Sequence, residues 1–278
     1  MEHVPSILPA GKKWQLVWHD EFDGTELDKS KWGFRRHLLQ HEHKTFCGEE
    51  GLEFRGDSCV HFKRLKKDDG EYYSCQLQTG SNFLDAPGEV FYEVAGHADA
   101  PQHRWPIAKL QEPKFLHKFG YYEIRCKLQK RYGWWSAFWL QSPIIGCCND
   151  PRIAGVEVDI MEYFKPENKL YCNNHWGGYG PDHKHDGNAN REPYLLEDTT
   201  DDFHIFGCDW SPDGYVYYAD GKQVWRCAGP VSHQEQFILV STECNGYRRS
   251  YHAAPELQAE TVDDEFVVDY VRVYDEIK

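Results

Sequence analysis

The chain has 278 residues, with 45 acidic side chains against 31 Lys and Arg, and a formal net charge of −14. This balance argues against nucleic acid and against an anionic membrane surface, because both select clustered Lys and Arg. No run approaches the roughly 20 apolar residues of a membrane span. Aromatic residues make up 15% of the chain, which suits a β-fold and also suits sugars, whose C–H faces pack on rings.

Short strand-like runs recur along the whole chain, and turn signals separate them. In chain order, we expect strands over residues 14–19, 60–65, 72–79, 119–128, 137–141, 156–161, 169–176, 203–210, 214–218, 223–227, 236–242 and 266–274. The turn signals SPDG at 211–214 and ADG at 219–221 predict two consecutive hairpins. No long stretch has helical period, and no linker or repeat interrupts the chain. The sequence therefore predicts a single all-β domain over residues 1–278, a sandwich or jelly roll.

Two longer stretches, residues 80–115 and 178–202, hold many Gly, Pro, Asp and His residues and show no clear period. Loops of this kind usually rim the binding face of a sandwich. We therefore expect both stretches to be loops beside the site.

The cysteines and the first residues bear on the compartment. None of the ten cysteines forms a C-x-x-C pair, and several, such as Cys126, lie in strand-like runs as small buried hydrophobes. Residues 1–11 lack the basic start and apolar stretch of a signal peptide. A reduced cytoplasmic protein is the simpler expectation, and a mature secreted enzyme stripped of its leader is the alternative.

One run, GVEVDIMEY at residues 155–163, gathers three acids. Alternation puts its valines toward the core and Glu157 and Asp159 on the opposite face. Strict alternation would then bury Glu162, and a buried unpaired carboxylate is costly. One extra residue at positions 160–161, a β-bulge, would return Glu162 to the acidic face. We therefore expect three acids on one concave surface.

Three like charges on one surface push their pKa values apart, so one carboxyl can stay protonated while another is ionised. A retaining glycosidase needs such a pair, a nucleophile and an acid/base roughly 5–5.5 Å apart. Strand bending and the reach of two Glu side chains could bring Glu157 and Glu162 together, with Asp159 between them sharing a proton or a hydrogen bond. A solvated acidic strand and a carboxylate calcium site are the alternatives.

Several further motifs occur in the same order. They are WQLVWHDEFDG at 14–24, FGYYEIRCK at 119–127, WWSAFWL at 134–140 and VDYVRVY at 268–274. Together with the E-x-D-x-x-E run, they resemble glycoside hydrolase family 16 over nearly the whole chain. The resemblance implies a concanavalin-like β-jelly roll of two antiparallel sheets with a concave substrate cleft.

The resemblance also implies roles for the acids, with Glu157 as nucleophile, Asp159 as helper and Glu162 as acid/base. The extra residue before Glu162 is similar to the branch that includes laminarinases and agarases. A retaining endo-hydrolase of a β-1,3- or β-1,4-linked glycan is therefore expected, with a β-glucan as first candidate. Residues 237–246, FILVSTECNG, depart from the LNLAVGG-like strand of ordinary laminarinases. A galactan-type hydrolase resembling agarases, porphyranases or β-1,3-galactanases is the alternative.

Six other residues are predicted to bind substrate: Trp134, Trp135, Trp139, His175, Trp176 and Glu243. One of the first three tryptophans is expected to form a platform under the sugar, and at least one other to be core. His175 could hydrogen-bond Asp159 or the sugar, and Glu243 shares a face with Ser241.

No cofactor is expected to be required, and no metal is assigned to the site. The H-x-H pairs His41/His43 and His183/His185 would each need a third ligand and a second shell to bind zinc. A structural Ca²⁺ near Glu21 and Asp269 is a family-like expectation.

The expected partner is an oligo- or polysaccharide, and the expected state is a monomer. A transglycosylase would use the same residues. Two rivals belong to other classes. A lectin on the same fold would usually lack one of the two glutamates, whereas this chain has both. A carboxylate-rich metal protein would be stabilised by calcium and would not bind glycans.

Overall fold

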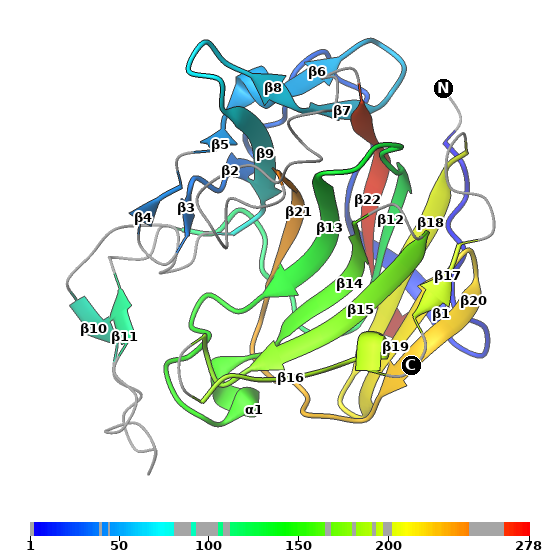
Figure 1. The fold of residues 1–278 in the computed structure, drawn as a ribbon. Coiled ribbons are helices and arrows are strands. Elements are labelled where there is room, and N and C mark those ends of the chain that lie inside the picture. The colour runs from blue at the N-terminus through cyan, green and yellow to red at the C-terminus, as the bar shows by residue number, and fades with distance from the viewer. Residues whose placement is uncertain are drawn as a thin grey trace.

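The chain forms two β-sheets packed face to face in the computed structural model (Figure 1). The structure describes residues 3–38, 41–43, 45–80, 90–92, 105–107, 112–164, 168–179, 182–190, 193–196, 202–244 and 264–278. We refer to the two layers as sheet I, which has 8 strands, and sheet II, which has 10. The described helices are too short and too polar to span a bilayer.

Sheet I runs in the order β20-β19-β18-β12-β22-β7-β6, with β1 also paired to β22. Its strands are β20 (Lys222–Cys227), β19 (Gly214–Ala219), β18 (His204–Ser211), β12 (Gly120–Lys127), β22 (Glu265–Ile277), β7 (Val60–Lys63), β6 (Leu52–Phe54) and β1 (Lys13–Asp20). Because β1 pairs with β22, the two ends of the chain lie in one sheet. The predicted hairpins β18–β19 and β19–β20 are confirmed.

Sheet II runs in the order β16-β15-β14-β13-β21-β9-β2, and three short strands pair at its sides. Its strands are β16 (Lys184–Gly187), β15 (Lys169–Trp176), β14 (Glu157–Tyr163), β13 (Trp134–Gln141), β21 (Phe237–Cys244), β9 (Tyr72–Gln78), β2 (Gly33–Phe34), β17 (Tyr194–Leu195), β5 (Phe46–Cys47) and β8 (Leu65–Lys66). The strand pairs of the two sheets are antiparallel, except β5 with β9.

The remaining elements are short. They are the strand pairs β3 (His37–Leu38) with β4 (His41–Glu42) and β10 (Val90–Tyr92) with β11 (Trp105–Ile107), the helix α1 (Pro151–Ala154), and the 3₁₀ turns η1 (Glu49–Gly51) and η3 (Asn188–Asn190). Every predicted strand overlaps a strand of the structure. The expectation of loops over 80–115 and 178–202 is wrong where β10, β11, β16 and β17 form, because strands of two to four residues show no readable alternation. Much of both stretches lies outside the described residues.

The core lies between the sheets and takes one face of each strand. It includes Val156, Val158, Ile160 and Met161 of the acidic run, all fully buried. Burying apolar surface of this kind contributes roughly 25 cal/mol per Å². All ten cysteines are buried free thiols, as expected of small hydrophobes.

The predicted bulge lies where the sequence placed it. Asp159 and Glu162 of β14 pair with Asn173 and Tyr171 of β15. Between these two pairs, two residues of β14, at positions 160 and 161, oppose one residue of β15. The register on β13 shifts at the same place, from Met161 to Asp159. The extra residue lets Ile160 and Met161 both enter the core, and Glu162 returns to the face of Glu157 and Asp159.

Gly155 sets the start of β14 and allows a testable prediction. Its φ is +90°, and a Cβ added there would lie 2.2 Å from Ser142 Cβ. We expect Gly155→Ala to lower the free energy of unfolding by about 2–4 kcal/mol, from backbone strain and overpacking. Gly70, with φ +81° and open space around it, is the matched control, for which Ala should cost only about 1–2 kcal/mol. Urea unfolding of both variants checks this, and equal costs would contradict the steric explanation.

Candidate active site

The three predicted acids lie together on the face of sheet II that points away from the core, which we call the outer face. Glu157 is half-buried, and Asp159 and Glu162 are buried. The neighbouring strands contribute the residues opposite them. On β15 these are His175 beside Glu157 and Asn173 beside Asp159. Sequence alternation and one bulge therefore bring three carboxylates to one surface.

Glu157 is held by two donors on one oxygen. Gln141 donates from Nε2 to Glu157 Oε2 at 3.0 Å, and the Tyr179 hydroxyl donates to the same Oε2. Burial and the charge of Glu157 raise the pKa of Tyr179 well above its usual value, which keeps the phenol a donor. With Oε2 engaged twice, Oε1 is the candidate attacking atom.

This arrangement makes Tyr179 a positioning residue for Glu157, the predicted nucleophile. We expect Tyr179→Phe to lower kcat about 10- to 100-fold, because a hydrogen bond to a charged group is worth about 1.5–3 kcal/mol. Tyr218→Phe, on sheet I, is the matched control and should leave kcat unchanged. Steady-state kinetics on both variants measure the effect. An unchanged kcat in Tyr179→Phe would show that Tyr179 does not contribute to catalysis.

Glu162 holds its proton to a higher pH than an exposed carboxyl group does. Burial, followed by the nearby charge of Asp159, raises the pKa of Glu162 to about 8. Asn173 Nδ2 donates to Glu162 Oε2 and opposes this rise only in part. At neutral pH Glu162 therefore retains a proton that it can give to a leaving group.

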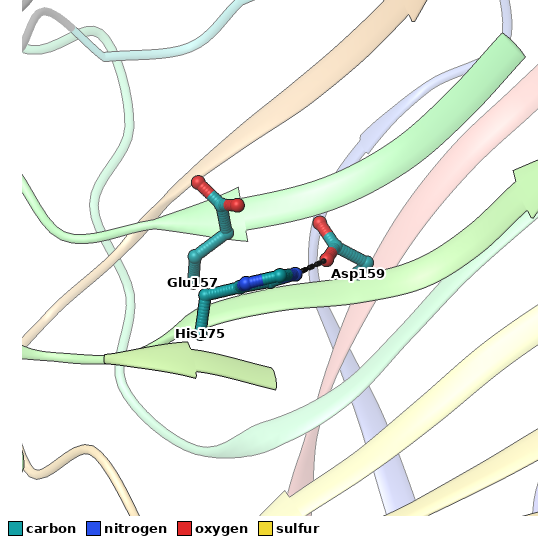
Figure 2. Close-up of side chains that lie close together, drawn as sticks. All are labelled: Glu157, Asp159 and His175. Atoms are coloured by element: carbon teal, nitrogen blue, oxygen red, sulfur yellow. Dashed lines mark ion pairs between the residues drawn. The ribbon is translucent and has the colours of Figure 1, made fainter. Parts of the chain in front are cut away.

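Asp159 is paired with His175, and Figure 2 shows the imidazole reaching from β15 to the carboxylate. His175 Nε2 lies 3.3 Å from Asp159 Oδ2, and His175 Nδ1 lies 2.9 Å from His183 Nε2. Burial alone would lower the pKa of His175, but the hydrogen bond and charge of Asp159 outweigh it and raise that pKa to about 9. The charge of Asp159 in turn favours the proton on Glu162.

The outer face also carries three of the predicted binding residues. Trp139 pairs with Asp159 across β13 and β14, and its Nε1 donates to Ser241 Oγ at 3.0 Å. The Arg35 guanidinium lies over the Trp139 ring at 5.0 Å. Trp139 is therefore the tryptophan placed next to the acids.

Trp135 and Glu243 lie farther along the same face. Trp135 stacks on Phe164 with centroids 5.1 Å apart, and it pairs with Glu243 of β21. Glu243 Oε1 accepts a hydrogen bond from Gln76 Nε2 at 3.0 Å. This end of the outer face is a mixed aromatic and polar surface.

Two predicted binding residues point the other way. Trp134 is fully buried in the core, where the Arg64 guanidinium lies 5.4 Å from its ring. Trp176 packs against the same core from the end of β15. Both side chains alternate with outer-face neighbours, Trp135 and His175, so strand parity turns them inward. The structure therefore corrects Trp134 to core packing, whereas Trp176 packs against the core and stays partly exposed.

Three residues that contact the acids were not predicted: Gln141, Asn173 and Tyr179. The first two could have been found by parity, because each lies two residues from an outer-face residue, Trp139 or His175. Tyr179 follows Gly177 and Gly178, which both have positive φ and turn the chain back toward Glu157. No pattern in the sequence indicates that return.

The expected Ca²⁺ residues do not suit a calcium ion. Both carboxylate oxygens of Glu21 accept from Arg272, at 2.8 and 2.7 Å. Asp269 accepts from Arg125. Calcium takes six to eight oxygen ligands, and these carboxylates are neutralised by guanidinium groups instead.

Comparisons with known proteins agree on one family. The family model described as "Glycosyl hydrolases family 16" matches residues 102–250, more than half of the chain. The chain is 25% identical to glucan endo-1,3-beta-glucosidase A1 of Niallia circulans over 96% of its own length, and spans only 39% of that relative. It is 24% identical to beta-porphyranase B of Phocaeicola plebeius, covering 98% of the chain and 88% of that protein.

A solved structure shares the fold of this chain. The catalytic domain of an endo-1,3-beta-glucanase (laminarinase) from Thermotoga petrophila superposes with a TM-score of 0.66 at 23% identity, covering 96% of this chain and 100% of that one. The jelly-roll expectation is thereby confirmed. The acids on their bulged strand, the two antiparallel sheets and the family match lead to one conclusion, that this chain belongs to glycosyl hydrolase family 16.

Proposed function

We propose that this protein is a retaining, endo-acting hydrolase of β-1,3- or β-1,4-linked glycans, with a laminarin-type β-glucan as the first candidate substrate. The observation that carries the proposal is the bulge at residues 160–161, which puts Glu157, Asp159 and Glu162 on one face, where burial and the charge of Asp159 raise the pKa of Glu162. The glucanase and laminarinase names of several relatives support the glucan.

In the first step, Glu157 attacks the anomeric carbon while Glu162 gives its proton to the departing glycosidic oxygen. The product is a covalent glycosyl-enzyme, and the aglycone leaves as an alcohol. In the second step, the carboxylate of Glu162 removes a proton from water, which attacks the same carbon and frees Glu157. The charge of Asp159 raises the proton affinity of Glu162, which keeps Glu162 protonated before the first step and strengthens it as the base of the second.

A galactan is the second candidate because the outer face is polar where the sequence departs from laminarinases. Ser241 and Glu243 of β21 both face this surface and bond to Trp139 and Gln76. The similarity to beta-porphyranase B over nearly the whole chain supports the same reading. The Glu243 carboxylate can accept a hydrogen bond from an axial sugar hydroxyl, so this surface suits a galactan as well as a glucan.

The test is a panel of laminarin, lichenan, agarose, porphyran and β-1,3-galactan, with products sized by chromatography and the first anomer read by NMR. We expect oligosaccharides of intermediate length from one glycan, with retained β-configuration. An α-configured first product would rule out the retaining mechanism. Binding of a glycan without cleavage by the wild type would favour the lectin, and products longer than the substrate would favour a transglycosylase.

A further inference from the structure

Glu157, Asp159 and His175 bring three metal-ligating side chains to one point on the outer face (Figure 2). One ligand atom of each lies within 4.8 Å of the other two. Two ligands at about 2.0–2.2 Å from a tetrahedral Zn²⁺ lie roughly 3.3–3.6 Å apart. The 3.3 Å between His175 Nε2 and Asp159 Oδ2 fits this spacing without rearrangement.

His183 orients the imidazole as a metal site requires. Its ring stacks on His175 at 5.1 Å and 5° between planes, and its Nε2 lies 2.9 Å from His175 Nδ1. This contact fixes the plane of the His175 ring and leaves His175 Nε2 directed at Asp159. A second-shell partner on one ring nitrogen is the usual support of a ligating histidine.

His175 Nε2 therefore faces a carboxylate oxygen across 3.3 Å. A dication between these two atoms would take both as ligands, and Glu157 offers it a second carboxylate.

We propose that Glu157, Asp159 and His175 form an inhibitory site for a Zn²⁺-class ion, which lies between His175 and Asp159 and coordinates Glu157. The set offers three protein ligands and leaves a fourth position for water. An imidazole ligand disfavours Ca²⁺ and Mg²⁺, which select oxygen. A bound ion would engage the proposed nucleophile.

The test is calorimetric titration of the full chain with ZnCl₂, without glycan, near pH 7.5. We expect one site that weakens at least about 10-fold in each of His175→Asn, Asp159→Asn and Glu157→Gln, since each substitution removes a ligand. Glu162→Gln is the matched control, because it removes a neighbouring carboxyl that is not a ligand. It should bind Zn²⁺ within about threefold of wild type, since the protonated carboxyl it replaces is neutral.

Two further readouts complete the design. Zn²⁺ should inhibit glycan cleavage by the wild type, with EDTA restoring activity, and Co²⁺ should give the visible bands of a four-coordinate ion. Absence of Zn²⁺ binding up to millimolar concentration, or equal affinity in His175→Asn and wild type, overturns the proposal. Because the titration needs no turnover, it holds or fails independently of the proposed hydrolase activity.

Discussion

Replacing the Glu157 carboxylate with an amide is expected to reduce kcat at least about 10⁴-fold while the protein folds normally. An amide cannot form the glycosyl-enzyme, so the double displacement loses its first step. Glu157 packs no core, and its contacts are two hydrogen bonds on the outer face. Kinetics on the glycan cleaved fastest, with thermal unfolding of the same preparation, measure both halves of this expectation.

Glu276→Gln is the control, because Glu276 is a surface carboxylate of β22 in sheet I that contacts Lys12. It should retain wild-type kcat and melting temperature. Glu157→Gln should still bind oligosaccharide. Substantial turnover in Glu157→Gln would show that another residue is the nucleophile.

The second large effect concerns the pH dependence that Glu162 gives to catalysis. The first step needs Glu162 protonated, so kcat/KM should fall as the pH rises through about 8, where burial and Asp159 place its pKa. Glu162→Gln should lose this alkaline limb and about 10²- to 10⁴-fold of activity on natural glycans. On aryl glycosides with a dinitrophenolate leaving group, which needs no proton, its first step should remain fast.

The same pKa shift predicts that Glu162→Gln, which lowers activity, raises the stability of the protein at alkaline pH. The folded pKa of about 8 exceeds the usual 4.5, so the stability that Glu162 contributes is present below pH 4.5 and is lost as the pH rises through 8. Glu162→Gln should therefore melt near the wild-type temperature at pH 4 and several degrees higher at pH 9. A lower melting temperature than wild type at pH 9 would contradict a buried, proton-holding Glu162.

The long strands of both sheets could be predicted because apolar residues recur in alternation along them, whereas short strands such as β2, β5 and β6 could not. The bulge could also be predicted, from the cost of burying Glu162 in a run whose other side chains alternate regularly. The register shift between Asp159 and Glu162 confirms that reasoning. Sheet II could therefore be predicted where it holds the acids, because burial dictates which side chain faces outward there.

The surroundings of the acids were less predictable. Adjacent tryptophans look alike in composition, and only the register of β13 against β14 assigns Trp134 to the core and Trp135 and Trp139 to the outer face. Tyr179 reaches Glu157 through a turn with two left-handed glycines, a contact between segments without a shared pattern. The short strands β16 and β17 have too few residues to show alternation.

The most direct measurement is to trap the intermediate. A 2-deoxy-2-fluoro glycoside of the preferred sugar, with an activated leaving group, should add one glycosyl unit to the intact protein mass. Peptide mapping should place the ester on Glu157, and the same label should form in Glu162→Gln. A label on Glu162 or on any other residue would contradict the division of roles between the two glutamates.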